Sequence, residues 1–176
     1  MKLGDGVEWA MHCVATLADL PIQGVISNAD LAEFHGLAPS YLIKHLKALA
    51  KAGILISVSG PKGGFRLAKA PEQITLLEIS DALTEQQPFF RCTEIRACFV
   101  GSQGACVAGE DGHALKPCEI NVAMLRAERA WRSSLQSVTV ADIRQQVRAN
   151  LSPAKLEVAG RWLGERIRFS PERRTS

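Results

Sequence analysis

The sequence predicts a mainly α-helical fold with one small β-hairpin, followed by a long helix. Three observations predict it. Short amphipathic segments separated by glycine and proline fill the first 85 residues, a Gly-Pro-Lys-Gly-Gly turn lies between two β-rich runs, and an apolar stripe with helical spacing follows residue 117. With 176 residues, 47% of them hydrophobic and 22% charged, the chain is typical of a globular protein with its own core.

Three helices are predicted in the first part of the chain. They span about residues 7–20, 29–35 and 40–52. Asp5 is placed to cap the first helix and Pro21 to end it. The second ends at Gly36, because glycine adopts a left-handed backbone at the least cost. Pro39 precedes the third helix, which repeats leucine on one face.

The β-hairpin is predicted directly after the third helix. Residues 54–58 are β-rich, residues 60–64 form the glycine-rich turn, and residues 65–68 can pair back as a second strand. A further helix over about residues 76–83 follows, with Thr75 as its expected cap. Helix, glycine turn, helix and hairpin in this order are typical of a winged helix-turn-helix, which is a DNA-binding fold.

Local charge supports a nucleic-acid partner, although the net charge of +3 is mild. Residues 34–71 contain no Asp or Glu. The basic residues of this stretch are Lys44, Lys47, Lys51, Lys62, Arg66 and Lys69. A surface of one sign over the whole motif is typical of a module that binds phosphates, whereas the plainer alternative is a solvated lysine face.

The candidate DNA contacts follow from the way such motifs bind. The second helix of the motif enters the major groove by its N-terminal residues, and the hairpin contacts the backbone or the minor groove. The outward face of the third predicted helix and the hairpin turn therefore supply the candidates, which are Ser40, Tyr41, Lys44, His45, Lys62 and Arg66.

The five cysteines are a second chemical signal. Cys13 lies in an apolar stretch and is expected in the core, whereas Cys92, Cys98, Cys106 and Cys118 fall within 27 residues that are rich in glycine. Their spacing lacks the Cys-x2-Cys pairs of common zinc sites, and thiolates also bind iron–sulfur clusters and copper(I). A disulfide switch with remaining thiols is the alternative to a metal or cluster site.

Glu8 and His12 are a third signal, because residues four apart share one face of a helix. A carboxylate and an imidazole at this spacing can share a metal centre. The alternative is an ordinary hydrogen bond between side chains on a solvent-exposed face.

Several segments resemble the winged-helix iron–sulfur regulators that include IscR, NsrR and RsrR, the Rrf-two family. Pro-Ser-Tyr-Leu at 39–42, Lys-Gly-Gly-Phe at 62–65, Ile-Thr-Leu-Leu-Glu-Ile at 74–79 and the cysteine segment carry the resemblance, which covers about residues 1–150. The family implies a homodimer formed along the helix after the last cysteine. The expected interface residues are Ile120, Met124, Ala127, Trp131 and Leu135.

The segment around Glu8 and His12, together with Cys-Thr-Glu-Ile-Arg at 92–96, looks closest to RsrR. That likeness implies a 2Fe–2S cluster with Glu8 and His12 from one subunit and cysteines from the other. Cys106 and Cys118 are the favoured ligands, Cys92 comes next, and Cys98 is a further candidate. Asn121 replaces the histidine that IscR carries three residues after its last cysteine, so that ligand is lost.

The sequence thus predicts four segments. They are a winged helix-turn-helix domain at 1–85, a cysteine-rich cluster-binding loop at 86–117, a dimerisation helix and a following helix at 118–151, and a C-terminal extension at 152–176. Trp162, Leu163, Ile167 and Phe169 among basic residues predict a weak amphipathic helix in this extension, to which the sequence assigns no role.

The predicted function is a dimeric transcription regulator, expected to be a repressor, that binds a double-stranded DNA operator and senses redox state, nitric oxide or iron–sulfur status. A cluster-free regulator that uses thiols or zinc is the alternative; an iron–sulfur electron carrier is less favoured, because it has no use for a basic winged helix. The sequence shows neither a glycine fingerprint for nucleotide binding nor a nucleophile–base pair, so we do not expect an enzyme with a small-molecule substrate. No apolar run reaches the roughly 18 residues of a membrane span and no secretory signal opens the chain, so a cytoplasmic protein without a membrane partner is expected.

Overall fold

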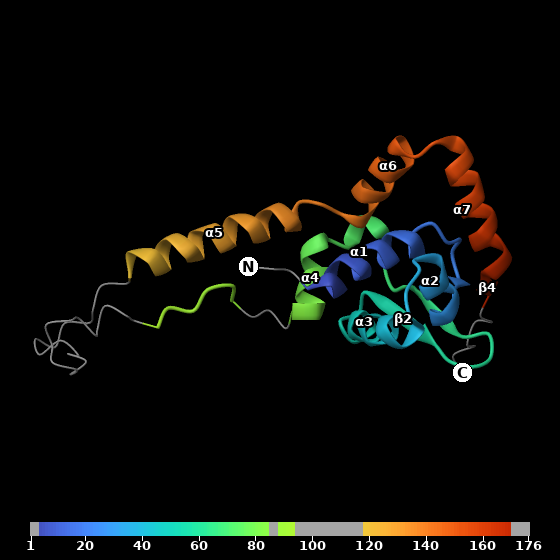
Figure 1. Ribbon diagram of the computed structural model, residues 1–176, viewed down its shortest axis with the longest axis horizontal. Coiled ribbons are helices and arrows are strands. Elements are labelled where there is room, and N and C mark those ends of the chain that lie inside the picture. Colours follow the sequence, from blue (N-terminus) through green and yellow to red (C-terminus); the bar gives the residue numbers. More distant parts are fainter. Residues whose placement is uncertain (1–3, 85–87, 94–117, 170–176) are drawn as a thin grey trace, which may run out of the picture. The chain divides into compact units, whose positions relative to one another are not determined.

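The computed structural model describes residues 4–84, 88–93 and 118–169 (Figure 1). The chain divides into two compact units. The first comprises Met1–Gln86 and Leu135–Ser176, and the second comprises Gln87–Ser134. Each unit is described by itself.

The first unit contains six helices and four short strands among the described residues. In chain order these are α1 (Asp5–Leu17), β1 (Gly24–Val25), α2 (Asn28–Phe34), α3 (Pro39–Lys51), β2 (Leu55–Val58), β3 (Gly64–Leu67), α4 (Leu76–Thr84), α6 (Val140–Asn150), α7 (Pro153–Arg166) and β4 (Arg168–Phe169). A 3-10 turn at Pro71–Gln73 precedes α4. Helix α5 (Glu119–Gln136) belongs almost entirely to the second unit.

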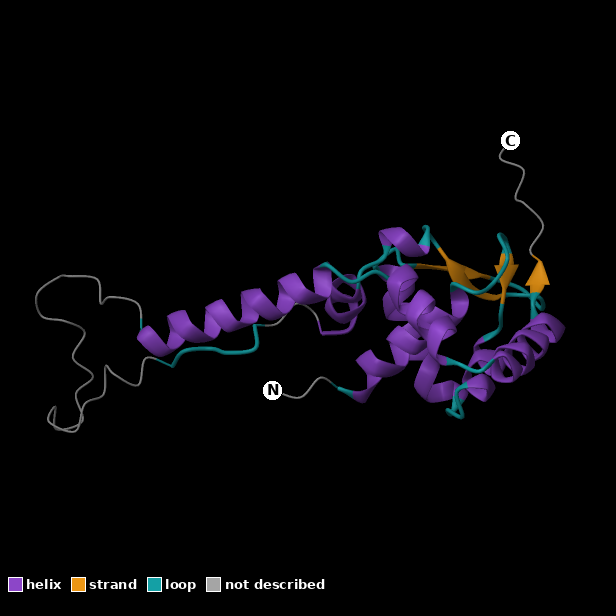
Figure 2. Ribbon diagram, turned by 90° about the horizontal axis from the view of Figure 1, so that it is seen from above, coloured by secondary structure: helices purple, strands orange, loops and turns teal. Residues whose placement is uncertain are grey.

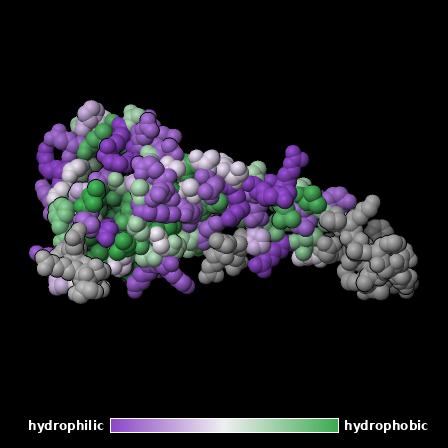
Figure 3. All heavy atoms as spheres, turned by 180° about the vertical axis from the view of Figure 1, so that it is seen from behind, coloured by the Kyte–Doolittle hydropathy of each residue, from purple (hydrophilic) through white to green (hydrophobic). Residues whose placement is uncertain are grey.

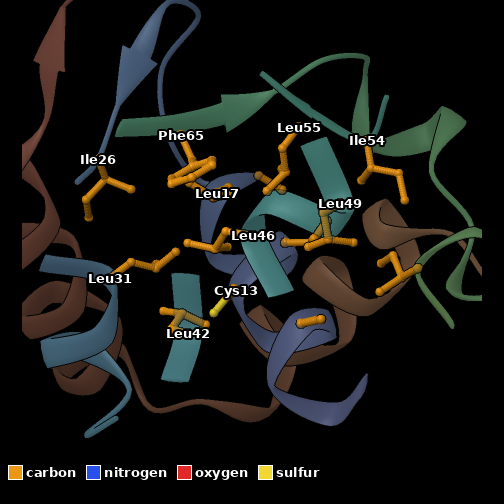
Figure 4. Packing of buried hydrophobic residues seen from close by; sticks show 14 of the residues in the cluster. Cys13, Leu17, Ile26, Leu31, Leu42, Leu46, Leu49, Ile54, Leu55 and Phe65 are labelled. Carbon is orange, nitrogen blue, oxygen red and sulfur yellow. The ribbon is translucent and has the colours of Figure 1, made fainter. Parts of the chain in front are cut away.

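The core of the first unit is built around α3. Leu42, Leu46 and Leu49 recur on one face of this helix and are fully buried, as the leucine spacing predicts. Figure 4 shows them packed with Cys13 of α1 and Phe65 of β3. This packing fixes α3 by its apolar face and leaves the opposite face available for other contacts.

The β2–β3 hairpin is antiparallel, with Leu55 opposite Leu67 and Val58 opposite Gly64. Figure 2 shows the strands of the first unit in orange, with this hairpin among them. Gly64 is required here, because a Cβ atom at this position would lie 2.0 Å from the backbone oxygen of Ile26. Helices α2 and α3 followed by this hairpin form a winged helix-turn-helix, so the predicted fold class is confirmed.

The predicted cap at Thr75 is confirmed, and the structure shows a second cap of the same kind at Thr139. At the start of α4, the Glu78 backbone N–H donates to the Thr75 hydroxyl at 3.2 Å, and the Thr75 backbone N–H donates to the Glu78 carboxylate at 2.9 Å. At the start of α6, Thr139 and Asp142 form the same reciprocal pair. Local sequence therefore determines where both helices begin.

The first helix differs from its prediction at both ends. Gly4 occupies the cap position, so Asp5 lies inside the first turn and favours the helix through its charge. The helix ends at Leu17, three residues earlier than expected. The chain then tightens into a 3-10-type turn, in which the Leu20 backbone N–H donates to the Leu17 carbonyl at 3.2 Å, because the approach to Pro21 disfavours helical geometry.

In the second unit, α5 is an 18-residue helix with no buried residue among those described. The Trp131 ring packs edge-on against the Phe89 ring, with centroids 4.5 Å apart, and the Phe89 backbone N–H donates to the Glu128 carboxylate at 3.2 Å. Figure 3 shows hydrophobic side chains at the surface along this helix. Within the described ranges, no helix is both long and apolar enough to cross a membrane.

Candidate functional site

The candidate DNA-binding face begins at the first turn of α3. Ser40 and Lys44 are exposed there, and the Lys44 ammonium lies 4.7 Å from the centre of the Tyr41 ring. The Asn28 side-chain amide of α2 donates to the Pro39 carbonyl at 3.0 Å, so the starts of the two helices are joined directly. The arrangement presents a hydroxyl, a phenol and an ammonium together at a helix N-terminus, where phosphates and base edges are contacted in this class of motif.

The hairpin adds a second basic surface. Lys62 is exposed at its turn, and Arg66 is half-buried on β3 opposite Ile56. Lys69 differs from the others, because its ammonium lies 2.6 Å from the Glu78 carboxylate and is neutralised there. Lys62 and Arg66 are therefore the candidate phosphate contacts of the hairpin.

His45 is placed differently from the other candidates on α3. Its ring lies against Gly6 of α1, where an added Cβ atom would come within 2.3 Å of the His45 Cε1 atom, and packs on Tyr41 with centroids 5.0 Å apart. The Nε2 atom is buried and has no hydrogen-bond partner. Burial, and secondarily the Lys44 charge, lowers the pKa of His45. The ring is thus a packing contact between α1 and α3.

The candidate metal ligands on α1 lie at the edge of an apolar hollow. Glu8 and His12 are both exposed and share one face of the helix, as their spacing predicts. They line a hollow of about 370 Å³ between α1, α4 and α6, whose other walls include Met11, Leu76 and Val147. The two donors therefore lie against apolar side chains and not on a plain solvated face.

Three aromatic rings meet beside this hollow. The rings of Trp9, His12 and His35 lie 6.1–6.3 Å apart, centre to centre. The Thr16 hydroxyl lies 3.2 Å from His35 Nε2 and donates to the His12 carbonyl at 3.0 Å. Burial, with a smaller contribution from His12, lowers the pKa of His35 to about 4.

His35 is a site residue that the sequence does not predict. It follows α2 directly and joins the ligand pair because the C-terminal end of α2 lies beside α1. No spacing rule connects positions 12 and 35, so a local pattern carries no signal for this contact. It places the end of the first helix of the DNA-binding motif next to a candidate metal ligand.

The cysteines divide into three groups. Cys13 is fully buried in the core, where burial raises the pKa of its thiol to about 12, so it is unsuited to metal binding as a thiolate. In the second unit, Cys118 is buried directly before α5, and Cys92 is half-buried. Cys98 and Cys106 lie outside the described residues.

Within the described part of the chain, no three His, Cys, Asp or Glu side chains gather into a metal-binding group. The face of α1 supplies two donors, Glu8 and His12. A four-coordinate iron or zinc site built on this pair therefore needs further ligands from elsewhere.

The predicted interface residues on α5 are only partly covered. Ile120 and Met124 are 65% and 40% exposed, and Ala127 is also exposed. Trp131 and Leu135 are half-buried. The apolar stripe is thus most open in the first half of the helix.

Comparison with known proteins gives a consistent result. A family model described as "Rrf2: Iron-dependent Transcriptional regulator" matches residues 3–146. YffB of Lactococcus lactis, named as an HTH-type transcriptional regulator, is 30% identical over 165 residues, which cover 94% of this chain and 99% of YffB. The HTH-type transcriptional regulator NsrR of Bacillus licheniformis is 26% identical, over 81% of this chain and 92% of NsrR.

Among solved structures, T. potens IscR is similar with a TM-score of 0.63 and 21% identity, covering 89% of this chain and 96% of the IscR chain. At this identity the likeness concerns the fold. The expected likeness to NsrR and IscR is confirmed, whereas the particular likeness to RsrR stays a prediction.

Proposed function

This chain belongs to the Rrf2 family of iron-dependent transcriptional regulators, and we propose that it is a homodimeric regulator whose operator affinity is controlled by a 2Fe–2S cluster. One observation carries the proposal. Glu8 and His12 lie together at an apolar hollow on α1, and His12 lies beside His35 at the end of α2. A candidate ligand pair is therefore in contact with the DNA-binding motif.

The donor chemistry suits this cofactor. The carboxylate of Glu8 and the imidazole of His12 are established types of iron ligand, and thiolates hold iron–sulfur clusters. We assign the remaining ligands to the cysteines of the partner subunit, with Cys106 and Cys118 first, Cys92 next and Cys98 as a further candidate. Cys118 directly precedes α5, and the N-terminus of a helix favours the thiolate. A bound 2Fe–2S cluster supplies a change of one unit of charge on reduction.

The residues around the ligand pair give such a charge change a route to DNA. Glu8 and His12 face water on one side and apolar side chains of the hollow on the other, so their charges are screened less than in bulk water. Trp9 and His35 lie about 6 Å from His12, so a change of charge on a cluster bound there would act on these two rings at short range. His35 follows α2, and α2 is joined to α3 by the hydrogen bond from Asn28 to Pro39.

On the DNA side, Ser40, Tyr41 and Lys44 are assigned to the major groove, with His45 behind them as a contact to α1. Lys62 and Arg66 are assigned to the phosphate backbone or the minor groove. The apolar stripe of α5 is assigned to the dimer, in which the distance between the two α3 helices sets the spacing of the operator half-sites.

Anaerobic purification with iron and sulfide analysis and visible absorption tests the cofactor. We expect iron and sulfide in equal amounts in the wild-type protein. Glu8→Ala and His12→Ala should each lose more than half of both, whereas Glu72→Ala, which removes an exposed carboxylate outside the hollow, should lose none.

A colourless protein without sulfide, even after anaerobic reconstitution, would overturn the cluster and favour the alternative of a thiol or zinc sensor. Unchanged cluster content and spectrum in both α1 variants would overturn the assignment of Glu8 and His12 while leaving a cluster held by other residues.

A further inference from the structure

The C-terminal part of the chain packs on the DNA-binding motif, although most of it lies beyond the matched family region, which ends at residue 146. Helix α7 lies against α2 (Figure 1), and the Trp162 ring packs on the Phe34 ring with centroids 5.2 Å apart. Leu163 is 7% exposed and belongs to the same hydrophobic core as the leucines of α3. The extension is therefore an integral part of the first unit.

Charged contacts continue this packing at the C-terminal end of α2. The Arg166 guanidinium lies 3.9 Å from the centre of the Trp162 ring and 3.8 Å from the Glu33 carboxylate. Glu33 and Phe34 directly precede His35. One end of α2 is thus held by an aromatic pair and an arginine.

A second set of contacts holds the N-terminal end of α2. The Arg168 guanidinium donates to the Asp30 carboxylate at 3.0 Å, and the same carboxylate oxygen accepts from the Ser27 hydroxyl at 2.5 Å. Ser27 is the cap of α2, because its hydroxyl accepts the Asp30 backbone N–H at 3.1 Å. Arg168 therefore binds directly to the Ser27–Asp30 pair that caps α2.

Strand β4 fixes the position of Arg168. It pairs antiparallel with β1, with Arg168 opposite Val25 and Phe169 opposite Gly24. The residue after β1, Ile26, exchanges backbone hydrogen bonds of 3.2 and 2.8 Å with Phe65 of the wing. The backbone of the extension is thereby paired with the same short segment that is hydrogen-bonded to the β2–β3 hairpin.

Helix α2 needs such support. It has seven residues, and a helix of this length is unstable unless tertiary contacts hold it. The hydrogen bond from Asn28 to Pro39 joins the starts of α2 and α3. A change in the orientation of α2 therefore shifts the N-terminal end of α3, which faces DNA. Contacts at both ends of α2 therefore control how α3 is presented.

We propose that α7 and β4 form a clamp, held by Trp162, Arg166 and Arg168, that fixes α2 at both ends and so positions α3 for sequence-specific DNA binding. The contacts described for Trp162, Arg166 and Arg168 are made with residues of α2. The clamp acts through α2 and gives the extension a role in specificity. The inference rests on the proposed DNA binding but not on the cluster.

The test compares Arg168→Gln and Trp162→Ala with Arg161→Gln. Arg161 lies on α7 and pairs with Glu157 of the same helix, so it is a matched control that leaves the clamp intact. The specific probe is a duplex enriched by the wild-type protein from a random library, and the reference probe is a scrambled duplex. Fluorescence anisotropy over a range of salt concentrations gives both affinities.

We expect both clamp variants to bind the enriched duplex at least tenfold more weakly, with the salt dependence and the affinity for the scrambled duplex unchanged, because the phosphate contacts stay in place. The control should bind as the wild type does. A merely structural role would weaken binding to both duplexes together. Wild-type specificity in Arg168→Gln, or equal loss on both duplexes, would overturn the clamp.

If the wild-type protein enriches no duplex, that result counts against the proposed function alone. Hydrogen exchange measured without DNA then still tests the clamp. The α2 amides should exchange at least tenfold faster in Arg168→Gln than in Arg161→Gln. Equal exchange would overturn the clamp independently of any operator.

Discussion

Helices α3 and α5 carry the same kind of pattern and use it differently. Both repeat apolar residues on one face, yet Leu42, Leu46 and Leu49 of α3 are fully buried within the chain, whereas no described residue of α5 is buried. The comparison shows that an amphipathic pattern predicts a face that will be covered but does not say what covers it.

The two coverings have different consequences. The apolar face of α3 packs on α1 and the hairpin, so its side chains stabilise the fold of one protomer. The apolar face of α5 stays open at Ile120 and Met124, so its side chains are available for association. Substitutions that are equal in chemistry should therefore affect folding on α3 and dimerisation on α5.

The largest effect is expected for the double substitution Ile120→Asp with Met124→Asp. Two carboxylates desolvated in an interface should raise the dissociation constant of the dimer by at least about 100-fold, while the thermal unfolding of the protomer stays close to that of the wild type. Sedimentation velocity measures the first quantity and circular dichroism the second. Arg129→Glu, an exposed change on the same helix, is the control; a dimer that persists in the double variant would refute the assignment of α5.

Leu46→Ala tests the other side of the comparison. Removal of a fully buried leucine should lower the free energy of unfolding by about 3 kcal/mol, because a cavity remains in the core. Urea unfolding gives this value, and Lys47→Ala at the neighbouring exposed position should change it by less than about 0.5 kcal/mol. A loss below about 1 kcal/mol for Leu46→Ala would show that the core around α3 is looser than described.

The outward face of α3 and the wing should affect DNA binding without affecting stability. Lys44→Ala and Arg66→Ala should each weaken operator binding and reduce the salt dependence by about one ion, because each removes one positive charge from the surface that faces DNA. Lys69→Ala should have the smaller effect, since its ammonium is already paired with Glu78. Anisotropy titrations at several salt concentrations measure the dependence of affinity on salt. The same salt dependence in all three variants would contradict the proposed DNA-binding face.

The smallest effect concerns acid stability. Burial lowers the pKa of His35 to about 4 and also lowers the pKa of His45, whereas both side chains bind a proton near pH 6.5 in the unfolded chain. The unfolded state then binds more protons, and stability should fall as the pH drops from about 7 toward 5. Between about pH 7 and pH 5, the free energy of unfolding measured with urea should fall less in His45→Gln than in the wild type. We expect His35 to cause the fall that remains in this variant. An equal loss in both proteins would contradict the burial of His45.

Local sequence predicts much of the first unit. The leucine spacing of α3, the reciprocal caps at Thr75 and Thr139, and the glycine-rich turn before β3 each follow from contacts within a few residues. The sequence also predicts Cys13 in the core, because an isolated cysteine in an apolar helix packs as a small hydrophobic residue.

Other features depend on contacts between distant segments. The two-residue strands β1 and β4 are too short to show an alternating pattern, and they pair because α7 brings position 168 back to position 25. The His45 ring lies against Gly6, and His35 lies beside His12, through the packing of α1 on the motif. No spacing rule within one helix predicts such neighbours.

By itself, the sequence determined the types of most elements, many of their ends, and the face of each longer helix that is apolar, because these depend on backbone geometry, caps and periodicity over short distances. Only the tertiary structure decided which apolar face is filled within the chain, where Glu8 and His12 lie relative to α2, and that the C-terminal extension packs on the DNA-binding motif. The physical reason is that burial and pairing are properties of residues that meet in space, and a linear pattern does not record which residues meet.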